Sequence, residues 1–145
     1  MKHDACNSFF RRPNGRPYFR ADGYIIGKTQ IRTTTIDEFC KENNISKIDI
    51  LKMDIQGAEL LALKGAITKL KNHLISLIYS ETIFSLSYDK GALYHEIADF
   101  LAKYGYTLYN IYNQNYNQKY ASNGQIMSCD SIFLSPQLRR KIDKK

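Results

Sequence analysis

The stretch that most constrains the fold is residues 48–65, which read IDILKMDIQGAELLALKG. It begins with an apolar run of the length of a buried strand, breaks at Gln56-Gly57, and continues with leucines at helical spacing. A strand, a tight turn and a helix form half of a βαβ unit, so this stretch predicts an α/β fold. In such folds the residues at the carboxyl end of a parallel strand face the crevice where ligands bind.

Polar residues follow the predicted strand: Asp54, Gln56 and, in the first helical turn, Glu59. Each also has a purely structural explanation. Asp54 can cap the following helix, Gln56 can be an ordinary turn residue, and Glu59 can interact with the helix dipole for roughly 0.3–1 kcal/mol. A carboxylate that ends an apolar strand is costly to desolvate unless it is paired, capping or beside a water-filled cleft. Asp54 is therefore the strongest candidate for a functional role among the three.

A second buried strand is predicted over residues 74–79, and it is followed by Ser80 and Glu81. A helix over residues 58–71 joins the two strands, so they should be parallel and connected by a right-handed crossover. Glu81 would then lie beside Asp54, and repulsion between the two carboxylates would raise the pKa of at least one, as suits a general base. The alternatives are that Glu81 caps or pairs with a basic loop residue, or that both carboxylates hold a divalent cation.

The remaining pattern completes an α/β unit. Thr35 and Glu38 have the spacing of a capping box at the start of a short helix that ends near residue 43. An amphipathic helix is predicted over residues 92–104, with Gly105 as a left-handed residue after it. Strands are predicted over 106–112 and 125–134, and the second should stop before Pro136. These two strands would be antiparallel because no helix joins them.

Three further features have open interpretations. The loop over residues 82–90 carries Phe84, Leu86 and Tyr88, which can form a lid or pack in the core. Residues 112–120 read as a hydrophilic hairpin loop, although their tyrosines could also stack on a base or a sugar. Gly65 interrupts the predicted helix and would be explained by close packing of that helix on the sheet.

The formal net charge of +7 is unevenly distributed. Residues 1–32 hold seven Lys/Arg and two Asp, residues 139–145 hold five Lys/Arg and one Asp, and the segment between them holds nine basic and eleven acidic residues. The basic residues therefore lie on two ends that we expect to be flexible. Solvated tails explain them more simply than arms attracted to phosphate or membrane do, and nucleic-acid binding is disfavoured.

The composition limits the location and the cofactor chemistry. The three cysteines are odd in number and widely spaced, which fits free thiols in a reducing cytoplasm. The three histidines form no ligand-spaced cluster, so no metal site is expected. No apolar run approaches the roughly 18 residues of a membrane span, and the first residues lack the apolar region of a secretory signal.

The strings KMDIQGAELLALKGA and LISLIYSE resemble the signature of the FkbM-type methyltransferases, a family that uses S-adenosylmethionine. Residues 34–39 resemble an upstream segment of that family, and residues 104–106 and 129–134 resemble its closing elements, so the resemblance covers about residues 33–135. The matching positions of the central signature are Lys52, Asp54, Gln56, Gly57, Glu59, Leu63, Lys64, Gly65, Ala66 and Glu81.

The resemblance implies the C-terminal half of a Rossmann-like methyltransferase sheet, with parallel strands, a final antiparallel strand and helices packed on the faces. It implies SN2 transfer of a methyl group from S-adenosylmethionine to a hydroxyl of a sugar or polyketide-like acceptor. Asp54 and Glu81 would be the catalytic residues, with Asp54 as the base or the carboxylate nearest the cofactor. Asp54, Gln56 and Glu59 would bind the cofactor.

The family pattern also has an earlier half with a glycine-rich cofactor loop, and no such loop precedes Thr33. We therefore expect a loop-rich basic segment at 1–32, a partial methyltransferase domain at 33–136 and a basic tail at 137–145. The partial domain should expose a strand edge that favours self-association. The alternative function is that of a catalytically inactive fragment that acts as a binding or interaction module.

Overall fold

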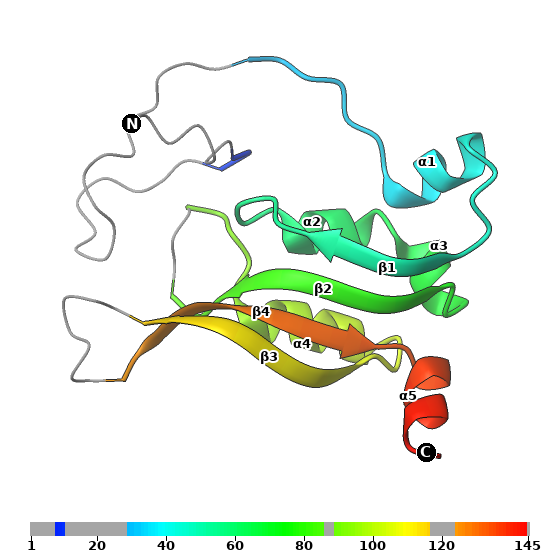
Figure 1. The fold of residues 1–145 in the computed structure, drawn as a ribbon. Coiled ribbons are helices and arrows are strands. Elements are labelled where there is room, and N and C mark those ends of the chain that lie inside the picture. Colours follow the sequence, from blue (N-terminus) through cyan, green and yellow to red (C-terminus); the bar gives the residue numbers. More distant parts are fainter. Residues whose placement is uncertain (1–7, 11–28, 86–88, 117–123, 145) are drawn as a thin grey trace.

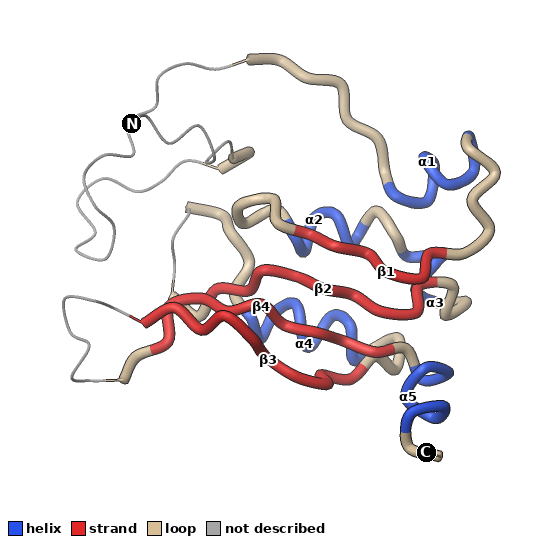
Figure 2. Tube along the Cα trace, in the orientation of Figure 1, coloured by secondary structure: helices blue, strands red, loops and turns tan. Residues whose placement is uncertain are grey.

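The computed structural model describes residues 8–10, 29–85, 89–116 and 124–144 (Figures 1 and 2). The elements in chain order are α1 (Ile36–Glu42), β1 (Ile48–Met53), α2 (Glu59–Lys64), α3 (Ile67–Lys71), β2 (Ile75–Ile83), α4 (Tyr94–Ala102), β3 (Thr107–Tyr116), β4 (Ile126–Leu134) and α5 (Pro136–Ile142). Helices and strands alternate through the first half, as the predicted α/β class requires.

The strands form one four-stranded sheet in the order β1-β2-β4-β3. β1 and β2 are parallel, whereas β4 is antiparallel to both of its neighbours, β2 and β3. The predicted parallel pair and the inserted antiparallel strand are therefore confirmed. β1 and β3 form the two edges of this sheet, and self-association through an edge stays a prediction.

Helices cover one face of the sheet. α2, α3 and α4 lie behind the strands in Figure 1, and their apolar side chains form one core with side chains from the strands. Strand residues alternate between the two faces. Ile78 and Phe133 point into the core and are 0% and 1% exposed, whereas their neighbours Tyr79 and Ile132 lie on the other face and are half-buried. No helix of the described chain covers that other face, which we call the open face.

The helix predicted over residues 58–71 is divided into α2 and α3 at Gly65. The Gly65 carbonyl accepts a hydrogen bond from the Asp37 backbone N–H at 2.9 Å. A Cβ added at Gly65 would lie 3.1 Å from the Cβ of Thr35, which caps α1 through the Glu38 N–H. The close packing predicted for Gly65 is therefore present, but it is packing on the start of α1 rather than on the sheet.

Two strands are longer than predicted. β2 continues through Glu81 to Ile83 because Glu81, Thr82 and Ile83 pair with residues 130–128 of β4. β3 continues to Tyr116, so residues 113–116 belong to a strand and not to the predicted loop. Phe84, a candidate lid residue, stacks on Tyr94 with the ring centroids 4.9 Å apart. The other two candidates, at 86 and 88, lie outside the described residues.

The basic tail is not a flexible end over residues 136–142, which form α5. Ser135 caps this helix by accepting the Leu138 N–H, and Pro136 occupies its first turn, where a missing N–H has no cost. Pro136 thus ends the strand, as predicted, and also begins a helix. Gly105 has φ of 77°, which confirms the left-handed residue after α4.

Two other predictions concern cysteines and membranes. Cys40 and Cys129 are buried free thiols. Among the described residues, no helix is both long enough and apolar enough to span a bilayer.

Candidate active site

A tight turn connects β1 to α2 and sets the position of the candidate residues. Gln56 and Gly57 both have positive φ, 55° and 97°, so the chain reverses within two residues. Glycine adopts this conformation freely, whereas a residue with a side chain has a cost of about 1 kcal/mol or more. The Ser8 hydroxyl donates a 2.7 Å hydrogen bond to the Gln56 carbonyl, so residues near the N-terminus also contact this turn.

Glu59 supports the turn from beneath. It is 1% exposed, and its Oε1 accepts a 3.0 Å hydrogen bond from the Ile55 backbone N–H. Burial raises the pKa of Glu59, the hydrogen bonds from backbone N–H groups oppose that rise, and the negative charge of Asp54 adds to it. Interaction with the helix dipole is therefore an incomplete explanation of Glu59, because its carboxylate is bound to the loop that carries Asp54 and Gln56.

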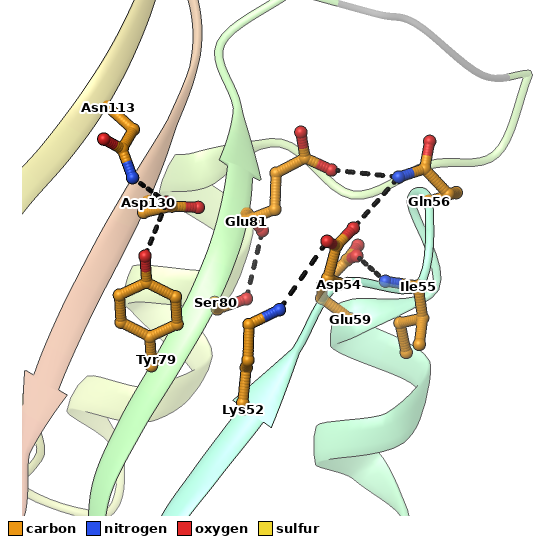
Figure 3. Close-up of polar contacts among 10 residues, drawn as sticks. All are labelled: Lys52, Asp54, Ile55, Gln56, Glu59, Tyr79, Ser80, Glu81, Asn113 and Asp130. Atoms are coloured by element: carbon orange, nitrogen blue, oxygen red, sulfur yellow. Dashed lines mark hydrogen bonds and ion pairs between the residues drawn. The ribbon is translucent and has the colours of Figure 1, made fainter. Parts of the chain in front are cut away.

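The Gln56 amide joins Asp54 to Glu81 (Figure 3). Its Nε2 donates to Asp54 Oδ1 at 3.0 Å and lies 3.4 Å from Glu81 Oε2. Asp54 does not cap the following helix, since Ala58 is the N-cap of α2 and no side chain bonds there. The structure therefore confirms that the two carboxylates lie together. Asp54 directly follows β1, as predicted, whereas Glu81 lies within β2 and not after its end. The capping alternative for Asp54 is wrong.

Lys52 provides the nearest positive charge. Its Nζ lies 3.6 Å from Asp54 Oδ2 and 5.9 Å from the centroid of the Tyr79 ring, on the open face of the sheet. Both Lys52 and Asp54 are more than half exposed, so the ion pair contributes little to stability. The described ion pairs include none to Glu81, so the alternative that Glu81 pairs with a basic loop residue has no support there.

The side chains of Asp54, Glu81 and Asp130 form an acidic row across the open face of the sheet. Met53 pairs with Ser80, which places Asp54 beside Glu81, and Glu81 pairs with Asp130 of β4. Glu81 lies in the middle of the row. Burial raises its pKa most, the negative charges of Asp54, Glu59 and Asp130 raise it further, and Lys52 lowers it. The sequence-based prediction that repulsion raises one carboxyl pKa is confirmed in direction for Glu81.

Sequence reasoning missed Asp130, which belongs to this row, and Tyr79 and Asn113, which adjoin it. Asp130 Oδ2 accepts hydrogen bonds from the Tyr79 hydroxyl at 2.6 Å and from Asn113 Nδ2 at 2.7 Å (Figure 3). The hydrogen bond to Asp130 is the largest cause of a raised Tyr79 pKa. The one charged side chain of the strand predicted over residues 125–134 was the available signal for Asp130, whereas nothing local indicated Asn113.

The described residues contain no group of three or more His, Cys, Asp or Glu side chains that could hold a metal ion. The Gln56 amide, and no third acidic side chain of the described residues, bridges Asp54 and Glu81. The arrangement instead offers carboxylate oxygens toward a cationic or hydroxyl-bearing ligand.

Comparison with known families identifies the family of this chain. A family model described as "Methyltransferase FkbM domain" matches residues 3–108, which is most of the chain and includes β1, the Gln56-Gly57 turn and all of β2. Asp54, Gln56, Glu59 and Glu81 all lie within the matched residues. Searches of curated proteins and of solved structures returned no significant match. The strand–turn–helix unit, the paired carboxylates and the extent of the match lead to one conclusion: this chain belongs to the FkbM methyltransferase family.

Proposed function

We propose that the chain takes part in transferring a methyl group from S-adenosylmethionine to a hydroxyl of a sugar or polyketide-like acceptor, and that Asp54, Gln56 and Glu81 line the reacting side of the site. The observation that carries this proposal is the Gln56 amide that joins carboxylates from two neighbouring parallel strands. Such strand ends are where open α/β sheets bind ligands.

The residues at this edge fit a cationic cofactor. S-adenosylmethionine carries its methyl group on a positively charged sulfonium, so the C–S bond breaks with its electron pair on sulfur while the acceptor oxygen bonds the methyl carbon. Asp54 and Gln56 would hold the cofactor near the turn, since an exposed carboxylate favours a nearby positive charge. Glu59 is buried beneath the turn, so we assign it the role of keeping Asp54 and Gln56 in position.

Glu81 is the better candidate for the general base. The base takes the hydroxyl proton as the oxygen bonds to carbon, and a carboxylate with a raised pKa accepts that proton more readily. Burial and the neighbouring negative charges raise the pKa of Glu81. The sequence favoured Asp54 in this role, but both Asp54 oxygens are engaged, one by Gln56 and the other by Lys52. Asp54 is therefore better suited to orienting the cofactor.

Calorimetry with two closely related ligands tests this proposal. S-adenosylmethionine and S-adenosylhomocysteine differ by the methyl group and the sulfonium charge, so a site lined by Asp54 and Glu81 should bind the charged ligand more tightly. The variant Asp54→Asn should lower the affinity for S-adenosylmethionine about tenfold, because a charge-assisted contact is lost. Its affinity for S-adenosylhomocysteine should change little.

Asp99→Asn is the matched control, because Asp99 is an exposed acidic residue on α4. It removes the same charge from the covered side of the sheet and should leave both affinities unchanged. The proposal fails if S-adenosylmethionine does not bind, or if Asp54→Asn and Asp99→Asn have the same effect.

A further inference from the structure

The hydrogen-bonded group of Tyr79, Asp130 and Asn113 lies on the open face directly beside Glu81. Glu81 of β2 and Tyr112 of β3 are both register partners of Asp130 in β4, so these three side chains lie on one face of the sheet. Figure 3 shows the group on the side of Glu81 that is opposite Asp54 and Gln56. A ligand at Glu81 can therefore contact Asp54 and Gln56 on one side and the group of Tyr79, Asp130 and Asn113 on the other.

A bulge in β3 brings Asn113 to this group. Between the pairs Tyr112/Asp130 and Asn115/Ser128, β3 has one residue more than β4. Regular alternation would put Asn113 on the face opposite to Tyr112, yet its Nδ2 donates to Asp130, the partner of Tyr112. Bulges re-aim side chains in this way, often beside functional sites.

The bulge depends on an unfavourable backbone conformation. Asn113 has φ of 48°, in the left-handed region that residues with a side chain rarely adopt. Asparagine tolerates this region better than most residues do, and glycine tolerates it best. The chain therefore holds an amide against Asp130 at a conformational cost of roughly 1 kcal/mol.

The group offers mostly hydrogen-bond acceptors. Asp130 Oδ2 takes both internal hydrogen bonds, and Oδ1 takes none from the described residues. The Asn113 amide oxygen and the Tyr79 hydroxyl oxygen also have lone pairs. Several convergent acceptors are best satisfied by a ligand with several O–H donors, whereas an apolar acceptor with one hydroxyl would leave them desolvated and unpaired.

One exposed tyrosine lies beside the same acceptors, and a second lies farther along the strand. Tyr112 is 43% exposed at the register position opposite Asp130, and Tyr116 is 47% exposed farther along β3. An aromatic ring beside carboxylate and amide groups suits a ligand with an apolar ring face and a polar rim, which describes a pyranose.

We propose that Tyr79, Asp130 and Asn113 bind the methyl acceptor and select one that carries several hydroxyl groups on a sugar-like ring. Asp130 accepts hydrogen bonds from hydroxyls that neighbour the reacting one, and this places the reacting hydroxyl at Glu81. The inference rests on the proposed function, since it assigns the acceptor side of the same site.

Nuclear magnetic resonance titrations of the whole chain test the inference. The probes are the methyl glycosides of glucose, galactose and mannose, with cyclohexanol as a six-membered ring that has a single hydroxyl. At least one glycoside should give saturable shifts at the backbone amides of Tyr79, Asn113 and Asp130, and cyclohexanol should not. Shifts of equal size with cyclohexanol, or none at these amides with any glycoside, would overturn the inference.

Two variants separate binding from folding. Asn113→Gly keeps the positive φ that the bulge requires and removes only the amide, so glycoside affinity should fall about fivefold with the fold intact. Asp130→Asn should lower that affinity about tenfold or more, and Asp99→Asn should leave it unchanged. Glycoside affinity that is unaltered in both Asn113→Gly and Asp130→Asn would also overturn the inference.

S-adenosylmethionine, added to the same samples, distinguishes the two proposals. If the inference is correct, Asp130→Asn weakens glycoside binding while cofactor binding stays as in the unaltered chain. Cofactor binding without glycoside binding would contradict the inference and leave the proposed function intact. Glycoside binding at Tyr79, Asp130 and Asn113 without any cofactor binding would contradict the proposed function and support the recognition of a polyhydroxylated ring.

Discussion

The two faces of the sheet are built from the same strands, yet their side chains differ in burial and in polarity. In β4, Phe133 points into the core, whereas Asp130 and Ile132 lie on the open face. In β2, Ile78 is fully buried beside Tyr79, whose hydroxyl reaches Asp130. The alternation of a strand thus lets one segment stabilise the fold and present a site.

Polar groups occur on both faces, but they are satisfied differently. On the covered face the Thr82 hydroxyl lies 2.6 Å from the Ser131 hydroxyl and donates to the Cys129 carbonyl at 3.2 Å. These groups are buried and satisfy one another, as a low-dielectric environment requires. On the open face the carboxylates of Glu81 and Asp130 are half-buried and that of Asp54 is exposed, so a ligand can reach them. Buried polar groups here serve the fold, and the more accessible ones form the candidate site.

The largest expected effect tests this contrast with two adjacent residues. Phe133→Ala should lower the free energy of unfolding by about 3–5 kcal/mol, because it leaves a cavity in the core. Ile132→Ala on the open face should lower it by only about 1 kcal/mol, since that side chain is half-buried. Urea denaturation measures both. Equal losses would mean that the open face is packed as tightly as the covered one.

The next effect concerns the buried hydroxyl group. Thr82→Val keeps the shape of the side chain and removes the oxygen that lies against Ser131, so the free energy of unfolding should fall by about 1–3 kcal/mol. Ser128→Ala in β4 removes a hydroxyl that accepts an exposed hydrogen bond from Asn115, and it should cost no more than about 0.5 kcal/mol. A Thr82→Val loss as small as that of Ser128→Ala would contradict the distinction drawn between the faces.

Much of the covered face and half of the candidate site could be predicted from the sequence. The apolar run of β1, the Gln56-Gly57 break and the leucines of α2 are local patterns, and the crossover rule then places Glu81 beside Asp54. The end of β2 was harder to predict. Glu81, Thr82 and Ile83 are polar or follow polar residues, and they are strand residues only because β4 pairs with them.

The other half of the site depends on contacts between distant residues. The partner of Glu81 follows from the register of β4, which is fixed by the whole ladder and not by the sequence around Asp130. Asn113 reaches Asp130 only through the bulge, and its polar surroundings resemble those of a loop. The break at Gly65 likewise reflects a contact with Thr35, which lies far earlier in the chain.

The smallest expected effect is a change in the free energy of unfolding with pH, which arises from Glu59 beneath the turn and from Glu81 on the open face. Burial raises the pKa of each above the ordinary value of 4.5, and the charge of Asp54 raises both further. The folded chain therefore holds these protons more tightly than the unfolded chain does. By linkage, the free energy of unfolding should decrease as pH rises from about 4.5 through the raised pKa values.

Glu59→Gln and Glu81→Gln should each flatten that decrease, because neither new amide titrates and the amide oxygen at position 59 can still accept the Ile55 N–H. Glu42→Gln, at an exposed position at the end of α1, is the control and should leave the slope unchanged. Chemical denaturation at a series of pH values gives the slopes. If Glu81→Gln flattened the curve and Glu59→Gln did not, the pH dependence would originate in the acidic row on the open face alone. An unchanged slope in both variants would mean that the fold does not raise the pKa of either carboxyl, and it would remove the reason for preferring Glu81 as the base.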